Sequence, residues 1–200
     1  MDLYIFDFDD TLAITDSRVR IVRNEQDIWM TSREFADFPI IDGDYIDFDD
    51  FKRAKGTLIK ATALEMEKAM DMVGEANVFI VTARAVGEPV KDWLLAEIGR
   101  SPEVVATNGG ANKRPWLIKQ LASQEYDKVI VYEDCTHNIR DLKEAVLEHN
   151  KKHGKNVHYS AMCILPDQTT MKMESHWRSE NLITEWDFKE ITKNFLRKTW

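Results

Sequence analysis

The sequence predicts an α/β fold in which a parallel β-sheet is sandwiched between helices, with a small helical cap inserted after the first strand. Short apolar runs rich in β-branched and aromatic residues recur along the chain, and segments with helical spacing separate most of them. Such runs are typical of strands buried on both faces, and repeated strand–helix–strand units connect through right-handed crossovers. Roughly sixty residues lie between the first two runs, more than a simple crossover needs.

Each predicted element follows from its local pattern. The predicted strands are residues 3–6, 78–81, 104–106, 129–132 and 157–165. Between them, apolar residues at helical spacing predict helices at about 89–98, 112–123 and 136–150, the first with Pro89 near its first turn and Gly99 at its end. Ligands of such folds bind beyond the carboxyl ends of the strands.

The predicted domain organisation is a core of residues 1–14 and 75–165, a cap of residues 15–74 and a C-terminal extension of residues 166–200. Within the cap, Thr62-Ala63-Leu64-Glu65 resembles a capping box that opens a helix through about Val73, and residues 31–38 can form a shorter helix. In the extension, a helix is predicted from about Thr184, with apolar residues on one face.

Composition narrows the classes of partner. The formal charge of the 200-residue chain is −8, which repels a polyanion, so a nucleic-acid partner is not favoured by charge. Two cysteines without an apolar N-terminal signal segment favour a reducing, cytoplasmic setting. No apolar run approaches the roughly 18–20 residues that span a bilayer, so no membrane partner is expected. The oligomeric state is left open.

The strongest chemical signal is Asp7-Phe8-Asp9-Asp10-Thr11, placed directly after the first predicted strand. Alternation along the strand directs Asp7 and Asp9 the same way, so two carboxylates converge where an α/β sheet binds its ligand. Close carboxylates require a cation, and oxygen ligands suit Mg²⁺. The alternative is a solvated turn in which Asp9 or Asp10 caps the following segment.

Polar residues also follow the second predicted strand, at Thr82-Ala83-Arg84. The Thr82 hydroxyl and neighbouring backbone N–H groups can hold a phosphoryl oxygen, and Arg84 can add a charge-assisted contact. The alternative is that Thr82 only caps a helix.

Lys113, at the predicted start of the next helix, can neutralise an attacking carboxylate and an incoming phosphate. Lys119 is the competing candidate.

Acidic residues Glu133 and Asp134 follow the strand that ends near Tyr132. Two acids in a pocket that already holds Asp7 need a cation, so Asp134 is the preferred third metal ligand. Glu133 and Asn138 are alternative contributors to the metal shell. The competing interpretation is that Asp134 or Thr136 caps the next helix.

In order and spacing, these four segments resemble the motifs of the haloacid dehalogenase superfamily of phosphohydrolases. Asp7-Phe8-Asp9-Asp10-Thr11 matches its first motif D-x-D-x-T, Thr82 its second, Lys113 its third and Glu133-Asp134 its acidic fourth. The resemblance covers about residues 2–140 and implies a Rossmann-like core. The fourth motif departs from the common forms, with Glu133 where Gly or Asp is frequent and Asn138 where a second Asp often lies.

The resemblance implies a Mg²⁺-dependent phosphatase. Asp7 would attack phosphorus, and Asp9 would protonate the leaving oxygen and then activate water. Mg²⁺ would be held by the Asp7 carboxylate, the Asp9 backbone carbonyl and Asp134. Thr82 and Lys113 would assist catalysis, and Thr82, Ala83, Arg84 and Lys113 would bind the substrate.

The substrate expected is a phosphorylated small molecule or nucleotide, with a nucleic-acid end as a further possibility. The alternative functions are a non-hydrolytic phosphoacceptor, which also gathers acids, a threonine and a lysine at a sheet edge, and a binding module of Rossmann-like fold without catalysis.

Overall fold

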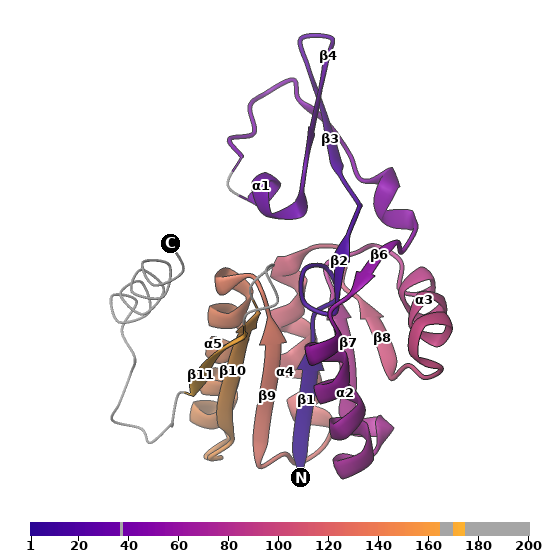
Figure 1. Cartoon of the computed structure of the whole chain (residues 1–200). Coiled ribbons are helices and arrows are strands. Elements are labelled where there is room, and N and C mark those ends of the chain that lie inside the picture. The colour runs from indigo at the N-terminus through magenta and orange to yellow at the C-terminus, as the bar shows by residue number, and fades with distance from the viewer. Residues whose placement is uncertain (37, 165–169, 175–200) are drawn as a thin grey trace.

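The computed structural model describes residues 1–36, 38–164 and 170–174, and its centre is a six-stranded sheet (Figure 1). Five strands run parallel and the edge strand β11 is antiparallel to β10. The strands of this sheet are β1 (Asp2–Phe6), β7 (Val78–Thr82), β8 (Glu103–Ala106), β9 (Lys128–Glu133), β10 (His158–Ile164) and β11 (Thr170–Glu174). The predicted α/β class, with a mostly parallel sheet flanked by helices, is confirmed.

The strand order β11-β10-β9-β1-β7-β8 places β1 at the centre. From β1 the chain moves outward to β7 and β8, and then crosses back to β9 on the other side of β1. The order of connection therefore reverses between β1 and β9, which pair from Asp2 with Lys128 to Phe6 with Tyr132. In open α/β sheets the crevice at such a reversal is the usual ligand site.

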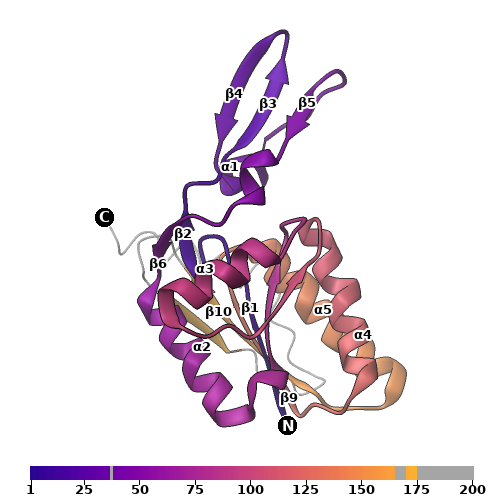
Figure 2. The same cartoon turned by 90° about the vertical axis from the view of Figure 1, so that its right-hand side faces the viewer.

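Helices cover both faces of the sheet (Figure 2). On one face, α4 (Lys113–Ser123) and α5 (Thr136–His153) pack against alternate residues of the strands, including Leu3 and Ile5. On the other face, α2 (Lys60–Val73) and α3 (Glu88–Ile98) pack against the strand residues that point the opposite way, including Phe6 and Ile80. Strand β7 is buried along its whole length, as predicted for a strand covered on both faces.

The cap rises from the carboxyl edge of the sheet on a narrow stem of two antiparallel strands (Figure 1). The stem is β2 (Ala13–Thr15) and β6 (Gly56–Leu58). Above it, β3 (Val19–Arg23), β4 (Gln26–Met30) and β5 (Tyr45–Asp47) form an antiparallel sheet, followed along the chain by a 3-10 turn (Asp49–Lys52). The short helix α1 (Ser32–Ala36) lies between β4 and β5.

The cap has an apolar cluster of its own. Val19, Ile21 and Met30 are buried there, and Phe35 and Phe51 pack against them. Apolar residues alternate with polar ones along β3, so one face of the small sheet is buried against this cluster.

Three predictions about organisation need correction. The cap is mainly β-structure, because alternating residues on β3 and β4 pair across a two-residue turn at Asn24 and Glu25, both with positive φ. The cap boundary of 15–74 extends too far, because α2 packs on the core sheet. The predicted capping box is also wrong: α2 begins at Lys60 and no side chain caps it.

At the C-terminal side, β11 joins the sheet, so residues 170–174 of the predicted extension belong to the core. The helix predicted from about Thr184 lies outside the described residues. Among the described residues, none of the helices combines the length and apolar character that crossing a membrane requires.

Gly56 tests the stem. Its φ is +147°, and a Cβ at this position would lie 2.2 Å from the Ile14 carbonyl oxygen of the facing strand. Gly56→Ala should therefore separate β2 from β6 and lower the free energy of unfolding by more than about 2 kcal/mol. Gly43→Ala is the matched control, because Gly43 also has positive φ but open space around its Cβ position. Thermal unfolding checks the difference, and equal losses in the two variants would contradict this description of the stem.

Candidate active site

Asp7 lies at the reversal point of the sheet because it directly follows β1. Its backbone N–H donates to the Tyr132 carbonyl at 2.9 Å, which extends the pairing of β1 with β9 by one residue. Asp7 thereby comes level with the end of β9, where Glu133 and Asp134 follow. The geometry of the sheet, and not sequence proximity, brings these acids together.

The loop after Asp7 is compact and buried. The Phe8 carbonyl accepts the N–H groups of Thr11, Leu12 and Ala13 at 3.4, 2.9 and 3.0 Å. Phe8, Thr11 and Leu12 are fully buried, and the Phe8 ring packs edge-on against Trp93. A solvated turn, the alternative interpretation of this segment, does not fit this burial.

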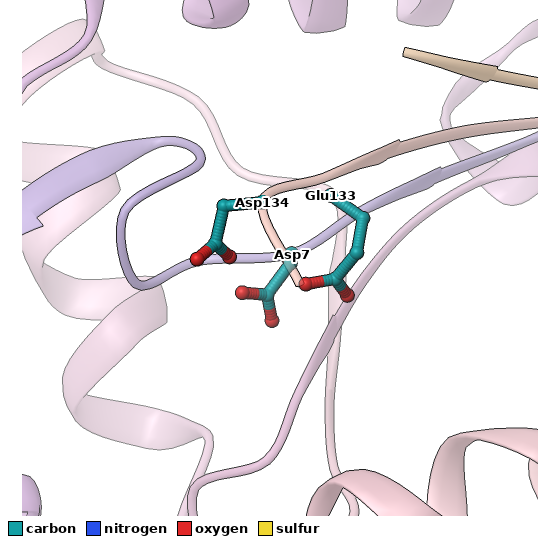
Figure 3. Close-up of side chains that lie close together, drawn as sticks. All are labelled: Asp7, Glu133 and Asp134. Atoms are coloured by element: carbon teal, nitrogen blue, oxygen red, sulfur yellow. The ribbon is translucent and has the colours of Figure 1, made fainter. Parts of the chain in front are cut away.

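Three carboxylates converge at the site (Figure 3). One oxygen from each of Asp7, Glu133 and Asp134 lies within 4.8 Å of the other two. Asp7 and Glu133 are buried, while Asp134 is partly exposed. The Thr11 hydroxyl donates to Asp134 at the long distance of 3.4 Å, which links the first motif to the fourth.

Lys113 holds two of these acids together. Its Nζ donates to Asp7 Oδ1 at 2.6 Å and to Glu133 Oε2 at 2.7 Å, and its side chain is 2% exposed. The other Glu133 oxygen accepts the Cys135 N–H at 3.1 Å. Glu133 is thus held at both oxygens, whereas Asp7 retains a second oxygen beyond its contact with Lys113.

The site raises the proton affinity of Asp7 and Asp134. Burial, followed by the charge of Glu133, raises the pKa of Asp7 to about 7 even though Lys113 acts in the opposite direction. Burial and the charges of Glu133 and Asp7 also raise the pKa of Asp134 well above its usual value. Burial alone would lower the pKa of Lys113, but the charges of Asp7 and Glu133 outweigh it and raise that pKa.

The donor set fits a hard divalent cation. Asp7, Asp134 and Glu133 supply carboxylate oxygens within reach of one another, and the charge of Lys113 leaves the cluster net negative when all three acids are ionised. Oxygen-only ligands of this kind suit Mg²⁺. Of the predicted ligand side chains, Asp7 and Asp134 are brought together. The predicted contact of the Asp9 backbone carbonyl stays a prediction.

The Asp9 side chain lies against Arg84 and the cap stem. Arg84 donates from Nε to Asp9 Oδ2 at 2.9 Å and from a terminal nitrogen to Asp9 Oδ1 at 2.7 Å. The Thr15 hydroxyl also donates to Asp9 Oδ1, at 2.7 Å. The remaining N–H groups of Arg84 face other protein acceptors, so the predicted phosphate contact of Arg84 would require it to release one of them.

The loop after β7 is fixed by the loop after β8. The carbonyls of Thr82, Ala83 and Arg84 accept backbone N–H groups from residues 107–109 at 2.8–3.0 Å. The Thr82 hydroxyl accepts the Arg84 N–H at 3.2 Å, and Thr82 is fully buried. A hydroxyl that accepts one bond still has a hydrogen to donate, so the predicted role of Thr82 and Ala83 in phosphate binding stays a prediction.

The structure separates the alternatives that the sequence left open. Lys113 contacts Asp7, whereas Lys119 is exposed on α4. Glu133 belongs to the acidic cluster, whereas the Asn138 side chain lies beside Gly110.

Two neighbours of Asp9 and Arg84 were not identified from the sequence, namely Thr15 and Ser17. The sequence indicates them only weakly, because they are simply polar residues on the short segment that leads from the first motif into the insertion.

Comparisons of the chain with models of protein families, with curated proteins and with solved structures find no significant match. The residues of the site and the motif resemblance are therefore the basis for assigning a function.

Removal of the Lys113 charge tests the electrostatic centre of the site. Lys113→Met leaves Asp7 and Glu133 buried without their cation, and breaking a buried ion pair in this way costs about 3–5 kcal/mol. Lys119→Met, on the exposed side of the same helix, should change the stability by less than about 0.5 kcal/mol. Denaturant unfolding at pH 8 compares the two. A small loss in Lys113→Met would contradict the bridging role.

Mg²⁺ should stabilise the fold in a pH-dependent manner. The folded pKa of Asp7, about 7, exceeds its usual value of 3.8, so the folded state binds more protons between these values and this group's contribution to stability falls as pH rises through that window. A cation offsets the resulting repulsion. At about 100 times its Kd, Mg²⁺ stabilises by about 2.7 kcal/mol, which raises Tm by roughly 5–10 °C.

Differential scanning fluorimetry with Mg²⁺ and with EDTA measures this effect. The Mg²⁺ shift should be large at pH 8 and small at pH 5.5, where protons compete for the carboxylates. Asp134→Asn should lose the shift, and Glu97→Gln, which removes an exposed acid on α3, should retain it. The absence of a Mg²⁺ shift in the unchanged protein at pH 8 would argue against the metal site.

Proposed function

We propose that the chain is a Mg²⁺-dependent phosphatase that hydrolyses a phosphate monoester through an aspartyl-phosphate intermediate on Asp7. The observation that carries this proposal is the position of the Asp7 carboxylate. It lies at the reversal point of the sheet, is held at one oxygen by Lys113 and adjoins Glu133 and Asp134. The motif order, which resembles that of the haloacid dehalogenase superfamily, supports the same proposal.

The proposed chemistry proceeds in two displacements. An Asp7 oxygen attacks phosphorus, the ester P–O bond breaks, and Asp9 donates a proton to the leaving oxygen. Asp9 then accepts a proton from a water molecule whose oxygen attacks phosphorus, which releases inorganic phosphate and restores Asp7. Splitting one difficult displacement in this way lowers each barrier. Bound Mg²⁺ would offset the negative charge that accumulates at the phosphoryl group.

Lys113 supports the nucleophilic role of Asp7. Its contact with Asp7 Oδ1 leaves Asp7 Oδ2 as the oxygen that is available to attack. Its charge offsets part of the repulsion between Asp7 and an incoming phosphate, in a buried setting where such an effect is larger than in water.

The proposed substrate is a phosphorylated small molecule or a nucleotide. The cap is small and joins the core through a two-stranded stem, and we extend the proposal to larger substrates, including a nucleic-acid end, on this ground. The chain charge of −8 favours the smaller substrates.

A non-hydrolytic phosphoacceptor is one alternative function, and the strand order argues against it. Phosphoacceptor domains of the flavodoxin-like kind have the order 2-1-3-4-5. Here the parallel strands follow the order 3-2-1-4-5 when β1, β7, β8, β9 and β10 are numbered in sequence. The candidate nucleophile also follows the first of these strands, and Asp9 supplies an acid/base for turnover.

Substitution of the nucleophile tests the proposal. Asp7→Asn should abolish Mg²⁺-dependent hydrolysis of an aryl phosphate, with a loss of at least about 10³-fold, because an amide does not form the covalent intermediate. Asp92→Asn, an exposed position on α3, is the matched control and should retain the activity of the unchanged protein. Circular dichroism checks that both variants fold.

The outcome separates the candidate functions. Full activity in Asp7→Asn would overturn the assignment of the nucleophile. A stable phosphoprotein after acetyl-phosphate treatment, without release of inorganic phosphate from any monoester, would favour the phosphoacceptor instead. A screen of phosphorylated metabolites, nucleotides and 3′- or 5′-phosphorylated oligonucleotides would then identify the substrate class.

A further inference from the structure

Arg84, just beyond the carboxyl end of β7, is buried to an unusual degree for an arginine. Its exposure is 3%, and its guanidinium lies about 5 Å from the ring centres of Phe8 and Phe51. Burial of a guanidinium is costly unless its donors are satisfied. The partners of Arg84 therefore indicate what the residue does.

All five N–H groups of the Arg84 side chain have acceptors. Nε and one N–H of the Nη2 group donate to the two oxygens of Asp9, and the second Nη2 hydrogen faces Ser17 Oγ at 3.1 Å. Nη1 donates to the carbonyls of Phe51 and Arg53 at 2.8 and 2.6 Å. A guanidinium has five such hydrogens, so this arrangement leaves none for a phosphate.

The acceptors fall into two groups. Asp9 belongs to the loop that carries the nucleophile. Ser17 lies on the segment that leaves β2 toward the cap, and Phe51 and Arg53 lie on the segment that returns from the cap to β6. The rigid, planar guanidinium thus connects one catalytic carboxylate to both crossings of the cap stem.

We propose that Arg84 is a positioning residue that fixes the orientation of the Asp9 carboxylate and makes that orientation depend on the seating of the cap. The proposal rests on the acid/base role proposed for Asp9. Arg84 acts through Asp9 and does not contact the substrate. A bidentate contact fixes both the position and the plane of a carboxylate, and a proton donor must lie within hydrogen-bond reach of the leaving oxygen in that fixed geometry.

The dependence on the leaving group tests this role. A poor leaving group needs a proton from Asp9, whereas a good one departs as the anion. Over a series of aryl phosphates, Arg84→Met should lose less than about tenfold in kcat/KM with 2,4-dinitrophenyl phosphate, whose phenol is the most acidic of the series. With phenyl phosphate, whose phenol is the least acidic, it should lose about 10²–10³-fold. The ratio kcat/KM is the correct measure because it reports the steps up to departure of the phenol.

Three further variants make the test specific. In an Asp9→Asn background, Arg84→Met should cause no further loss, because the residue to be positioned is already absent. Ser17→Ala, which removes one cap contact of Arg84, should give a smaller loss with the same dependence on the leaving group. Arg114→Met, which removes an arginine paired with Glu144 and Glu148 on the outer face of α4 and α5, should leave the series unchanged.

Two results would overturn the proposal. A loss of equal size across the series would indicate a general structural role. A rise in the Ki of inorganic phosphate with no dependence on the leaving group would indicate a direct phosphate contact. If Arg84→Met does not fold, Arg84→Lys takes its place, since a lysine keeps the charge but cannot form the bidentate contact.

A double-mutant cycle on unfolding keeps this inference separate from the proposed function. Arg84→Met and Asp9→Asn should destabilise the fold together by less than the sum of their single effects, with a coupling of about tenfold in the unfolding equilibrium constant. This measurement needs no activity. If the unchanged protein hydrolyses no phosphate ester, the proposed function fails, and additive unfolding effects would independently overturn the pairing of Arg84 with Asp9.

Discussion

The contact of the Lys113 ammonium with Asp7 and Glu133 is the interaction on which the rest of the site depends. Both carboxylates are buried at the ends of the adjacent parallel strands β1 and β9. The pairing of these strands brings the two carboxylates together although their negative charges repel each other. The helix that follows β8 begins at Lys113 and inserts the opposite charge between them. Lys113 begins α4, the helix through which the chain crosses from β8, on one side of β1, to β9, on the other. The site therefore depends on this crossover.

The compensation by Lys113 is incomplete, and this is the feature that makes the cluster a functional candidate. A purely structural ion pair would match its charges, because an uncompensated buried carboxylate is costly. Asp134 adds a third acid to the same space, and burial, followed by the charge of Glu133, raises the pKa of both Asp7 and Asp134. Buried acids that destabilise the fold in this way are found most often at functional sites, where a bound ligand supplies the opposite charge.

Much of the core could be predicted from sequence, because each buried parallel strand is a short apolar run and each acid follows such a run directly. Asp7 and Asp134 were predicted in this way, and Lys113 was predicted from its position at the start of a helix. The insertion of a cap was also predicted, but its β-structure was not, although the alternating residues of β3 and β4 around Asn24 and Glu25 are typical of a hairpin. Glu65, three residues after Thr62, suggested a helix start, but the Thr62 hydroxyl is buried without a hydrogen-bond partner among the described residues. Packing of α2 on the sheet overrides that local pattern.

The environment of Arg84 illustrates a stricter limit on sequence analysis. An arginine two residues after a strand that ends at such a site is a reasonable phosphate ligand on residue type alone. Two of its acceptors are backbone carbonyls of Phe51 and Arg53, more than thirty residues earlier in the chain, and a carbonyl leaves no trace in residue identity. The β2–β6 stem places these carbonyls beside the first motif, so the role of Arg84 follows from how the insertion leaves and re-enters the core. A motif can therefore identify which residues surround a site, while the division of labour among them depends on the path of the backbone.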